Sequence, residues 1–282
     1  MGQIYIIQDI SLLEQLQNKT IVVETDDIEK IEEIYQTVQK CNRLFCIKLY
    51  VKQNITSISL KEEWKNIPLV VYVVRGERCE VRGERNEDCG DLGNVRDLMG
   101  MLPVLRKLNI KFFLDGAVAQ NYEAVQILSS LGVYSGIVIN EKADWEKLTD
   151  LIYYALCGRV AHAPIEPFQY VYDMYERNRL VDYGTAFFEN SERFEYLAEG
   201  RKQKAESRRQ KAIPITLFSK APLVANWQRF FYEGSECAAC EGWRICMGKY
   251  AEMKDKNDCR DFTVEWLNVV DNMKFRRVKS IE

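Results

Sequence analysis

The first 158 residues alternate between short apolar runs and stretches with helical periodicity. Each run is apolar on both faces, which is typical of a parallel strand that is covered on both sides. Alternating strands and helices predict an α/β fold built on a parallel sheet. The six predicted strands are Gln3–Gln8, Thr20–Thr25, Leu44–Val51, Pro68–Arg75, Ile110–Asp115 and Tyr134–Asn140.

Six strands with intervening helices favour a (β/α)6 partial TIM-like barrel, with an open doubly wound sheet as the alternative. Between the strands, Asp27 and Asn121 are placed to cap helices, and Gly132 is placed to end the second of them. Asn94 is a third candidate cap. No glycine-rich nucleotide-binding motif follows any predicted strand.

Composition limits the class of protein. The net charge is −3, so no global basic field attracts nucleic acid. No charged and apolar leader opens the sequence, and the longest apolar stretches are only strand-length, so we expect a cytoplasmic protein without membrane segments. Nine cysteines without a leader suggest reduced thiols. His162 is the single histidine, which excludes sites that need two, and we expect it to be structural.

Four cysteines gather near the C-terminus with the spacing C-x2-C-x5-C-x12-C, within a polar segment rich in glycine. Two cysteines two residues apart suit a shared metal, and two more complete a tetrathiolate site for zinc or an iron–sulfur cluster. Four ordinary buried cysteines are the alternative. The predicted ligands are Cys237, Cys240, Cys246 and Cys259.

These patterns divide the chain into a barrel over residues 1–158, a connector over 159–230 and a cysteine module over 231–282. The connector includes a highly charged run at 199–211, which is most simply a solvated face. A repeated Arg-Gly-Glu-Arg motif follows the fourth strand. Arg75 and Arg78 from this repeat, with Asn140 after the sixth strand, are candidates for binding a peptide or partner, and an exposed charged hairpin is the alternative.

The combination of a six-stranded barrel with C-x2-C-x5-C and a later cysteine resembles the radical SAM enzymes that carry a C-terminal SPASM domain. The segment Trp243–Lys249 contributes to a resemblance to ribosomal peptide maturases. The resemblance to the radical SAM enzymes with a SPASM domain implies that Cys237, Cys240, Cys246 and Cys259 hold an auxiliary [4Fe–4S] cluster, with zinc as the alternative. The family usually has another cysteine where Tyr250 stands, so a further auxiliary cluster is not expected.

The family binds its catalytic cluster through C-x3-C-x2-C after the first strand, whereas Gln8–Gln15 contains no cysteine. Without that cluster the usual cleavage of SAM is not expected, and no SAM cofactor is predicted. Cys46, on the third strand, is expected to face the core. The chain is therefore similar to pseudo-radical-SAM proteins of Bacteroidales-type ribosomal peptide modification systems, including cysteine-repeat peptide maturases.

This resemblance implies an accessory or maturase protein that binds a precursor peptide, a radical SAM partner, or both. Two alternatives stay open. One is a distinct enzyme that uses carboxylates at the barrel mouth, for which Glu24, Asp26 and Asp115 are the candidates. The other is an electron relay through an auxiliary [4Fe–4S] cluster, which requires iron rather than zinc at the four cysteines.

Overall fold

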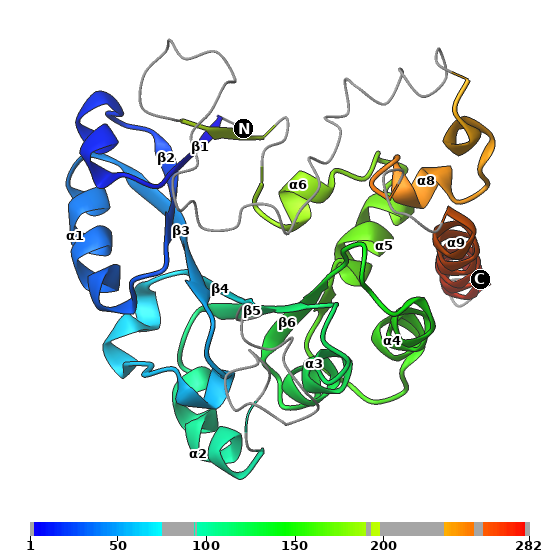
Figure 1. Cartoon of the computed structure of the whole chain (residues 1–282), viewed down its shortest axis with the longest axis horizontal. Coiled ribbons are helices and arrows are strands. Elements are labelled where there is room, and N and C mark those ends of the chain that lie inside the picture. Colours follow the sequence, from blue (N-terminus) through cyan, green and yellow to red (C-terminus); the bar gives the residue numbers. More distant parts are fainter. Residues whose placement is uncertain are drawn as a thin grey trace. The chain divides into compact units, whose positions relative to one another are not determined.

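The fold is described by a computed structural model that covers residues 3–74, 93, 95–189, 193–197, 234–250 and 256–279 (Figure 1). The chain forms two compact units. The first comprises Met1–Leu114 and Arg193–Leu217, and the second comprises Asp115–Glu192 and Phe218–Glu282. The cysteine module therefore belongs to the same unit as the last predicted strand.

The first unit is a parallel sheet in the order β5-β4-β3-β2-β1-β8. Its register sets Ile4 beside Thr20, and Glu24 beside Lys48. The strands are β1 (Ile4–Ile7), β2 (Thr20–Thr25), β3 (Arg43–Val51), β4 (Leu69–Val73), β5 (Ile110–Asp115) and β8 (Phe194–Tyr196). The connections hold η1 (Ile10–Gln15), η2 (Ile28–Lys30), α1 (Ile31–Cys41), η3 (Ile55–Ser57), η4 (Glu62–Asn66) and α2 (Val95–Leu105).

The helix α1 covers one face of β2 and β3 (Figure 1). Its apolar stripe of Ile31, Ile34 and Val38 is buried, as the helical periodicity predicted. The Asp27 side chain accepts a hydrogen bond from the Glu29 backbone and caps η2, which leads directly into α1. The face of β2 and β3 that is turned away from α1 carries side chains of the sheet itself, including Glu24 and Lys48.

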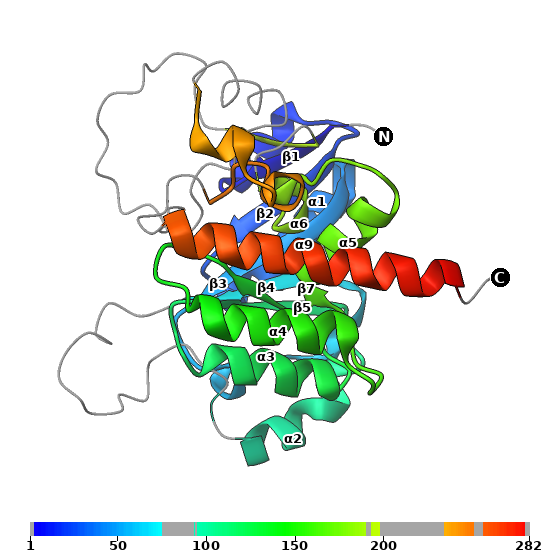
Figure 2. The ribbon, with the colours of Figure 1, turned by 90° about the vertical axis from the view of Figure 1, so that its right-hand side faces the viewer.

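The second unit combines a short parallel pair with packed helices. Its strands are β6 (Tyr134–Val138) and β7 (Ile165–Glu166), and they pair in parallel. The helices α3, α4 and α9 lie in successive layers, with α4 against both neighbours (Figure 2). The helical elements are α3 (Asn121–Ser130), α4 (Trp145–Cys157), α5 (Phe168–Glu176), α6 (Tyr183–Ala186), η8 (Glu236–Ala239), α8 (Trp243–Cys246) and α9 (Lys256–Lys279).

Aromatic side chains form much of the core of this unit. The ring of Trp266 on α9 packs edge-on against the ring of Phe168, with 5.0 Å between ring centres. It also contacts Phe262 in a tilted arrangement, with 5.6 Å between ring centres. Trp145 on α4 contacts both Phe262 and Tyr250. These three aromatic neighbours help to bury Trp266 and Tyr250 almost completely and connect the cysteine segment to α4, α5 and α9.

The structure confirms the predicted α/β class, with parallel strands and helices arranged as in a partial TIM-like barrel. All six predicted strands are present, and those at Thr20–Thr25 and Ile110–Asp115 have the predicted bounds. Gly132 follows α3 with a φ of +82°, as expected for a residue that ends a helix.

The predicted cap at Asn121 is wrong. The residue before α3 is Gln120, which makes no capping hydrogen bond with its side chain. Asn121 instead lies inside the helix, fully buried, and its amide donates to the Asp115 carbonyl at 2.9 Å. Its side chain therefore holds the preceding turn rather than the start of the helix.

Several predictions lie outside the described residues. These are Arg75 and Arg78, the cap at Asn94 and the charged run at 199–211. Among the helices of the described part of the chain, none combines the length and apolar character that crossing a membrane requires.

Candidate functional site

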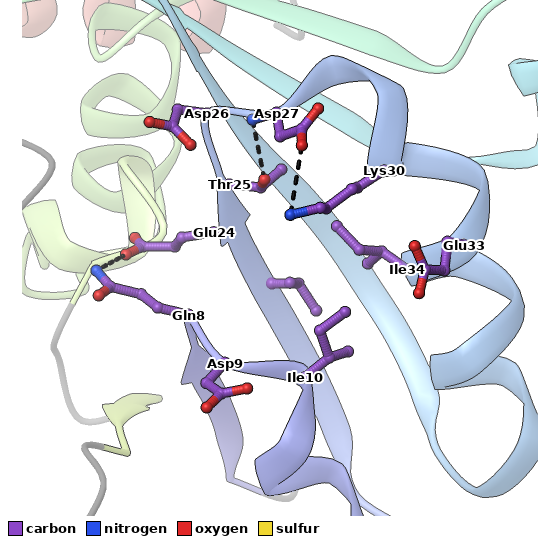
Figure 3. A pocket seen from close by; sticks show the side chains of 11 residues that line it. Gln8, Asp9, Ile10, Glu24, Thr25, Asp26, Asp27, Lys30, Glu33 and Ile34 are labelled. Atoms are coloured by element: carbon purple, nitrogen blue, oxygen red, sulfur yellow. Dashed lines mark hydrogen bonds and ion pairs between the residues drawn. The ribbon is translucent and has the colours of Figure 1, made fainter.

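A buried ion pair stands on the face of the first-unit sheet that is turned away from α1. The Glu24 carboxylate accepts a hydrogen bond from the Lys48 ammonium at 2.7 Å, and both side chains are completely buried. The two residues are direct neighbours in the register of β2 and β3. Figure 3 shows Glu24 pointing away from the helix that carries Glu33 and Ile34.

Neutral donors complete the shell around Glu24. The Tyr196 hydroxyl on β8 donates to it at 2.7 Å, the Tyr50 hydroxyl at 3.2 Å and the Gln8 amide at 3.1 Å. The Lys48 ammonium also lies 5.1 Å from the centre of the Tyr72 ring. The Glu24 carboxylate on β2 therefore joins the end of β1, β3 and the edge strand β8, and Lys48 extends the cluster to Tyr72 on β4.

The electrostatics of this cluster disfavour proton transfer at Glu24. Burial, the largest single influence, raises the pKa of the carboxyl group, but the charge and hydrogen bond of Lys48 together with the hydrogen bonds of Tyr196 and Gln8 outweigh burial and hold that pKa below its ordinary value. Glu24 is therefore ionised at neutral pH, and its oxygens are occupied by hydrogen bonds within the sheet. A general acid or base needs a pKa near the working pH and an accessible proton, and Glu24 has neither.

A pocket of about 460 Å³ opens beside this cluster, at the carboxyl ends of β1 and β2 (Figure 3). Carboxylates dominate its polar lining, and Lys30 forms an ion pair with Asp27 at 3.4 Å. Asp26, one of the sequence candidates, is exposed at its edge. The acidic residues that line the pocket are Asp9, Glu24, Asp26, Asp27 and Glu33.

The third candidate carboxylate belongs to the second unit. Asp115 is buried, and its side chain accepts hydrogen bonds from the Asn140 amide at 2.6 Å and from the Ala117 backbone at 2.9 Å. The Asn140 side-chain oxygen Oδ1 in turn accepts a hydrogen bond from the Lys142 backbone N–H. Asp115 and Asn140 thus hold each other and the two turns that follow β5 and β6.

The four candidate ligands lie in the second unit, on two segments. Cys237 lies in the first turn of η8, whose start is capped by the Ser235 side chain, and Cys240 follows its last residue. Cys246 ends α8, and Cys259 lies near the start of α9. All four cysteines are partly buried and none forms a disulfide. The helices α8 and α9 contact each other, which brings their ends into one region.

The surroundings of Cys246 resemble those of a metal-bound thiolate. Its sulfur accepts hydrogen bonds from the backbone amides of Tyr250, at 3.5 Å, and of Gly248. Such amide donors are the usual outer partners of a ligating sulfur. Burial raises the pKa of the Cys246 thiol to about 12, with smaller effects from Cys259 and Cys237. A cation would be needed to keep this thiol ionised.

The donor chemistry of the four thiols fits a soft metal or an iron–sulfur cluster. As placed, no group of three or more histidine, cysteine, aspartate or glutamate side chains in the described ranges could hold a metal ion. The charges of Cys259 and Cys237 both contribute to the raised pKa of Cys246, so each of these two thiols acts electrostatically on Cys246. Metal binding would therefore require the two cysteine segments to close further.

Sequence reasoning missed the partners of these sites. Lys48 is a charged residue within an otherwise apolar strand, and this pattern could have predicted a buried charge. Tyr250, at the position where the resembling family has a cysteine, is buried against Trp145 and Phe262. Tyr183 is also buried and donates a hydrogen bond to the Ile245 carbonyl at 3.0 Å. Tyr183 and Tyr250 thus anchor the cysteine segment, through a hydrogen bond to Ile245 and through ring contacts with Trp145 and Phe262.

His162 packs among side chains of the second unit. Its Nδ1 lies 3.0 Å from the Ser129 hydroxyl, and its ring stacks on Tyr154 at 5.0 Å. Its other nitrogen lies 3.2 Å from the Tyr154 carbonyl. These contacts agree with the structural role expected for the single histidine. Cys46 is 3% exposed, as predicted for a core residue.

Comparisons with known proteins identify no family. No protein-family model matches the chain, and no curated protein matches its sequence. One similar solved structure is described as native anSMEcpe with bound AdoMet. The match covers 99% of both chains at 11% sequence identity and a TM-score of 0.47. At this level of similarity the match adds no conclusion about fold or function.

Proposed function

We propose that this chain is an accessory protein of ribosomal peptide modification that binds a precursor peptide or a radical SAM enzyme and does not cleave AdoMet itself. The observation that carries the proposal is the connection between β1 and β2. There, Asp9 caps η1 and the segment Gln8–Gln15 offers no thiol for a catalytic cluster.

The buried cluster around Glu24 supports the same proposal. Gln8, the residue after β1, donates to Glu24, and Glu24 pairs with Lys48. The carboxyl ends of barrel strands usually carry reactive groups. Here Lys48 on β3 balances the charge of Glu24 at the end of β2, and Gln8 after β1 donates a hydrogen bond to the same carboxylate. A scaffold or binding role agrees with this arrangement better than acid–base catalysis.

In this proposal the four cysteines hold a metal group that shapes the second unit. Cys237, Cys240, Cys246 and Cys259 would be the ligands, and a [4Fe–4S] cluster or zinc would cross-link η8, α8 and α9 when bound. Structural metal sites contribute directly to folding where the local core is small. The thiols of Cys46 and Cys157 lie outside this set.

The proposal is tested by affinity isolation of the tagged full-length chain from its native host under anaerobic conditions. We expect a radical SAM enzyme, a short precursor peptide, or both to co-purify, as identified by mass spectrometry. The purified chain, supplied with iron, sulfide, reductant and AdoMet, should form no 5′-deoxyadenosine. Recovery of neither partner, or formation of 5′-deoxyadenosine, would overturn the proposal.

An electron relay is a second candidate that uses the same four cysteines. The amide hydrogen bonds to Cys246 favour it, because hydrogen bonds to sulfur tune the potential of an iron–sulfur cluster. Metal analysis with an optical spectrum separates the two candidates. A colourless protein that holds one zinc ion excludes a relay and is compatible with the accessory role.

A further inference from the structure

Two cations meet at one oxygen atom in the second unit. The Arg244 guanidinium on α8 and the Lys274 ammonium on α9 each donate a hydrogen bond to the side-chain oxygen Oδ1 of Asn178, and both donor–acceptor distances are 3.2 Å. The two donor nitrogens are therefore no further apart than twice that distance. Like charges this close repel each other, so the arrangement is favourable only where negative charge or another attraction compensates the repulsion.

The ring of Tyr175 on α5 limits the positions of both cations. The guanidinium carbon of Arg244 lies 4.2 Å from the ring centre, and the ammonium of Lys274 lies 5.4 Å from it. Tyr175 is 5% exposed, so the ring is part of the core, whereas the two cationic side chains are half-buried and reach the surface. Cation–π attraction to one ring offsets part of the repulsion. The pair of cations is thus held together in the absence of a ligand.

The end of α5 does not need these cations to satisfy its carbonyl groups. Asn178 has a φ of 51°, and its backbone amide donates to the Tyr175 carbonyl at 3.0 Å. The backbone amide of Arg179 donates to the Met174 carbonyl at 2.8 Å. These two hydrogen bonds form a Schellman motif, which satisfies carbonyls of the last helical turn from the backbone itself. The two cations therefore converge on the side chain of Asn178 rather than on the helix carbonyls.

The positive charge at this place is only partly balanced. Among the residues that the structure describes, no carboxylate forms an ion pair with Arg244 or Lys274. Asp271 stands nearby, where its carboxylate accepts a hydrogen bond from the Tyr175 hydroxyl, and the Arg244 guanidinium donates to the same hydroxyl at 3.4 Å. One neighbouring carboxylate thus faces two cations, which leaves positive charge for a further anion.

The surroundings favour a carboxylate that belongs to a peptide. The planar fork of an arginine matches the two oxygens of a carboxylate. The charge of Asp271 repels a doubly charged anion such as phosphate more strongly than it repels a single carboxylate. The exposed stretch after α5 adds the positive charges of Arg177 and Arg179 and the apolar side chain of Leu180, which is 50% exposed. Clustered arginines beside an apolar contact suit an acidic peptide segment.

We propose that Arg244 and Lys274, held together by Asn178 and Tyr175, bind the side-chain carboxylate of an acidic peptide segment. Their N–H groups that are not bonded to Asn178 donate to the carboxylate oxygens. The choice of a peptide as the ligand rests on the proposed function, whereas the site itself does not involve the four cysteines. A simpler reading is that the two cations only stabilise the C-terminal end of α5 through its dipole, and this reading predicts no binding of peptide.

The test is fluorescence anisotropy of the full-length chain with a dye-labelled peptide of alternating glutamate and leucine, amidated at its C-terminus, at low ionic strength. The comparison peptide has glutamine in place of glutamate and is made both amidated and with a free C-terminal carboxylate. We expect both comparison peptides to bind at least about tenfold more weakly than the glutamate peptide. Inorganic phosphate should displace the glutamate peptide no better than acetate does at equal ionic strength.

Variants of the chain locate the binding. Arg244→Met should weaken binding of the glutamate peptide about tenfold, and Lys274→Met several-fold, because each variant loses a charged donor. The matched control is Lys147→Met, at an exposed lysine of the same unit. The ammonium of Lys147 lies 5.9 Å from the centre of the Tyr122 ring and donates to the Ala119 carbonyl at 3.4 Å, so the control also removes a cation that lies over a tyrosine. Its affinity should stay within about twofold of the wild type. Circular dichroism checks that each variant is folded.

A variant that gains affinity keeps the test decisive if Arg244→Met does not fold. Asp271→Asn removes the competing negative charge and keeps an oxygen that can accept from Tyr175, so we expect the glutamate peptide to bind several-fold more tightly. Equal binding of the glutamate peptide and either comparison peptide, or better displacement by phosphate than by acetate, would overturn the inference. So would an Arg244→Met affinity equal to that of the control, or unchanged or weaker binding by Asp271→Asn. Co-purification of a partner with a chain that fails this test would uphold the proposed function and overturn only the inference.

Discussion

Replacing Lys48 with methionine tests the buried cluster of the first unit. At an effective dielectric constant of about 20, unit charges 2.7 Å apart attract by about 6 kcal/mol, and the cost of burying both charges offsets part of this. Breaking a buried pair typically costs about 3–5 kcal/mol. Because Gln8, Tyr50 and Tyr196 still donate to Glu24, we expect Lys48→Met to lose about 3 kcal/mol of unfolding free energy.

The assay is urea unfolding at pH 7, followed by circular dichroism. The double variant Glu24→Gln/Lys48→Met removes both charges and should recover to within about 1–2 kcal/mol of the wild type. The matched control is Lys107→Met, which breaks an ion pair with Glu62 at 2.9 Å. Both of those side chains are more than half exposed, so the control should lose no more than about 1 kcal/mol. A Lys48→Met loss as small as that of the control would refute the reasoning.

The pH dependence gives an independent check of the sign. In the wild type the pKa of Glu24 is lowered on folding, so the pair contributes stability above the ordinary pKa of 4.5 and loses it as the pH falls through the folded value. Without Lys48, burial is left to raise the pKa of the carboxyl group. Folding of Lys48→Met would then take up a proton, and its deficit should shrink between pH 7 and pH 5. A deficit that grows over this range would contradict the account.

Two further predictions concern the support of the cysteine segment. Gly242→Ala places a methyl group 2.2 Å from the Thr263 hydroxyl and 3.0 Å from its backbone carbon, so urea unfolding should show a loss of about 1–3 kcal/mol. The control Gly100→Ala, with open space around it in α2, should gain about 0.5–1 kcal/mol, and equal effects would contradict the packing. Tyr183→Phe removes the hydrogen-bond donor to the buried Ile245 carbonyl and should lower the free energy of unfolding by about 1–3 kcal/mol in the same assay. An unchanged free energy of unfolding would argue against that hydrogen bond.

The six main strands were predictable because each is a mostly apolar run of strand length. The sequence did not predict β7 or β8, since strands of two and three residues leave no periodic pattern. Their positions depend on pairing with strands far away in the sequence, as when Phe194 lies beside Ile4. Local patterns carry no information about such pairing.

The candidate sites show the same limit. Cysteine spacing singled out the four thiols because their chemistry is local to one segment. The partners of Glu24 were not predictable, since Lys48 and Tyr196 meet it only through sheet pairing. Asn121 looked like a helix cap because asparagine favours that position. In the structure its amide instead satisfies the Asp115 carbonyl, a buried acceptor that only the tertiary fold creates.

We propose that the four cysteines hold a metal group on a chain whose segment Gln8–Gln15 contains no cysteine. The most direct test is metal and acid-labile sulfide analysis, with an optical spectrum, of the anaerobically purified full-length chain and its Cys237→Ser and Cys246→Ser variants. The account predicts one zinc ion or one [4Fe–4S] cluster per wild-type chain and its loss in both variants. A wild-type chain that is folded and free of metal, or variants that keep the full metal content, would contradict it.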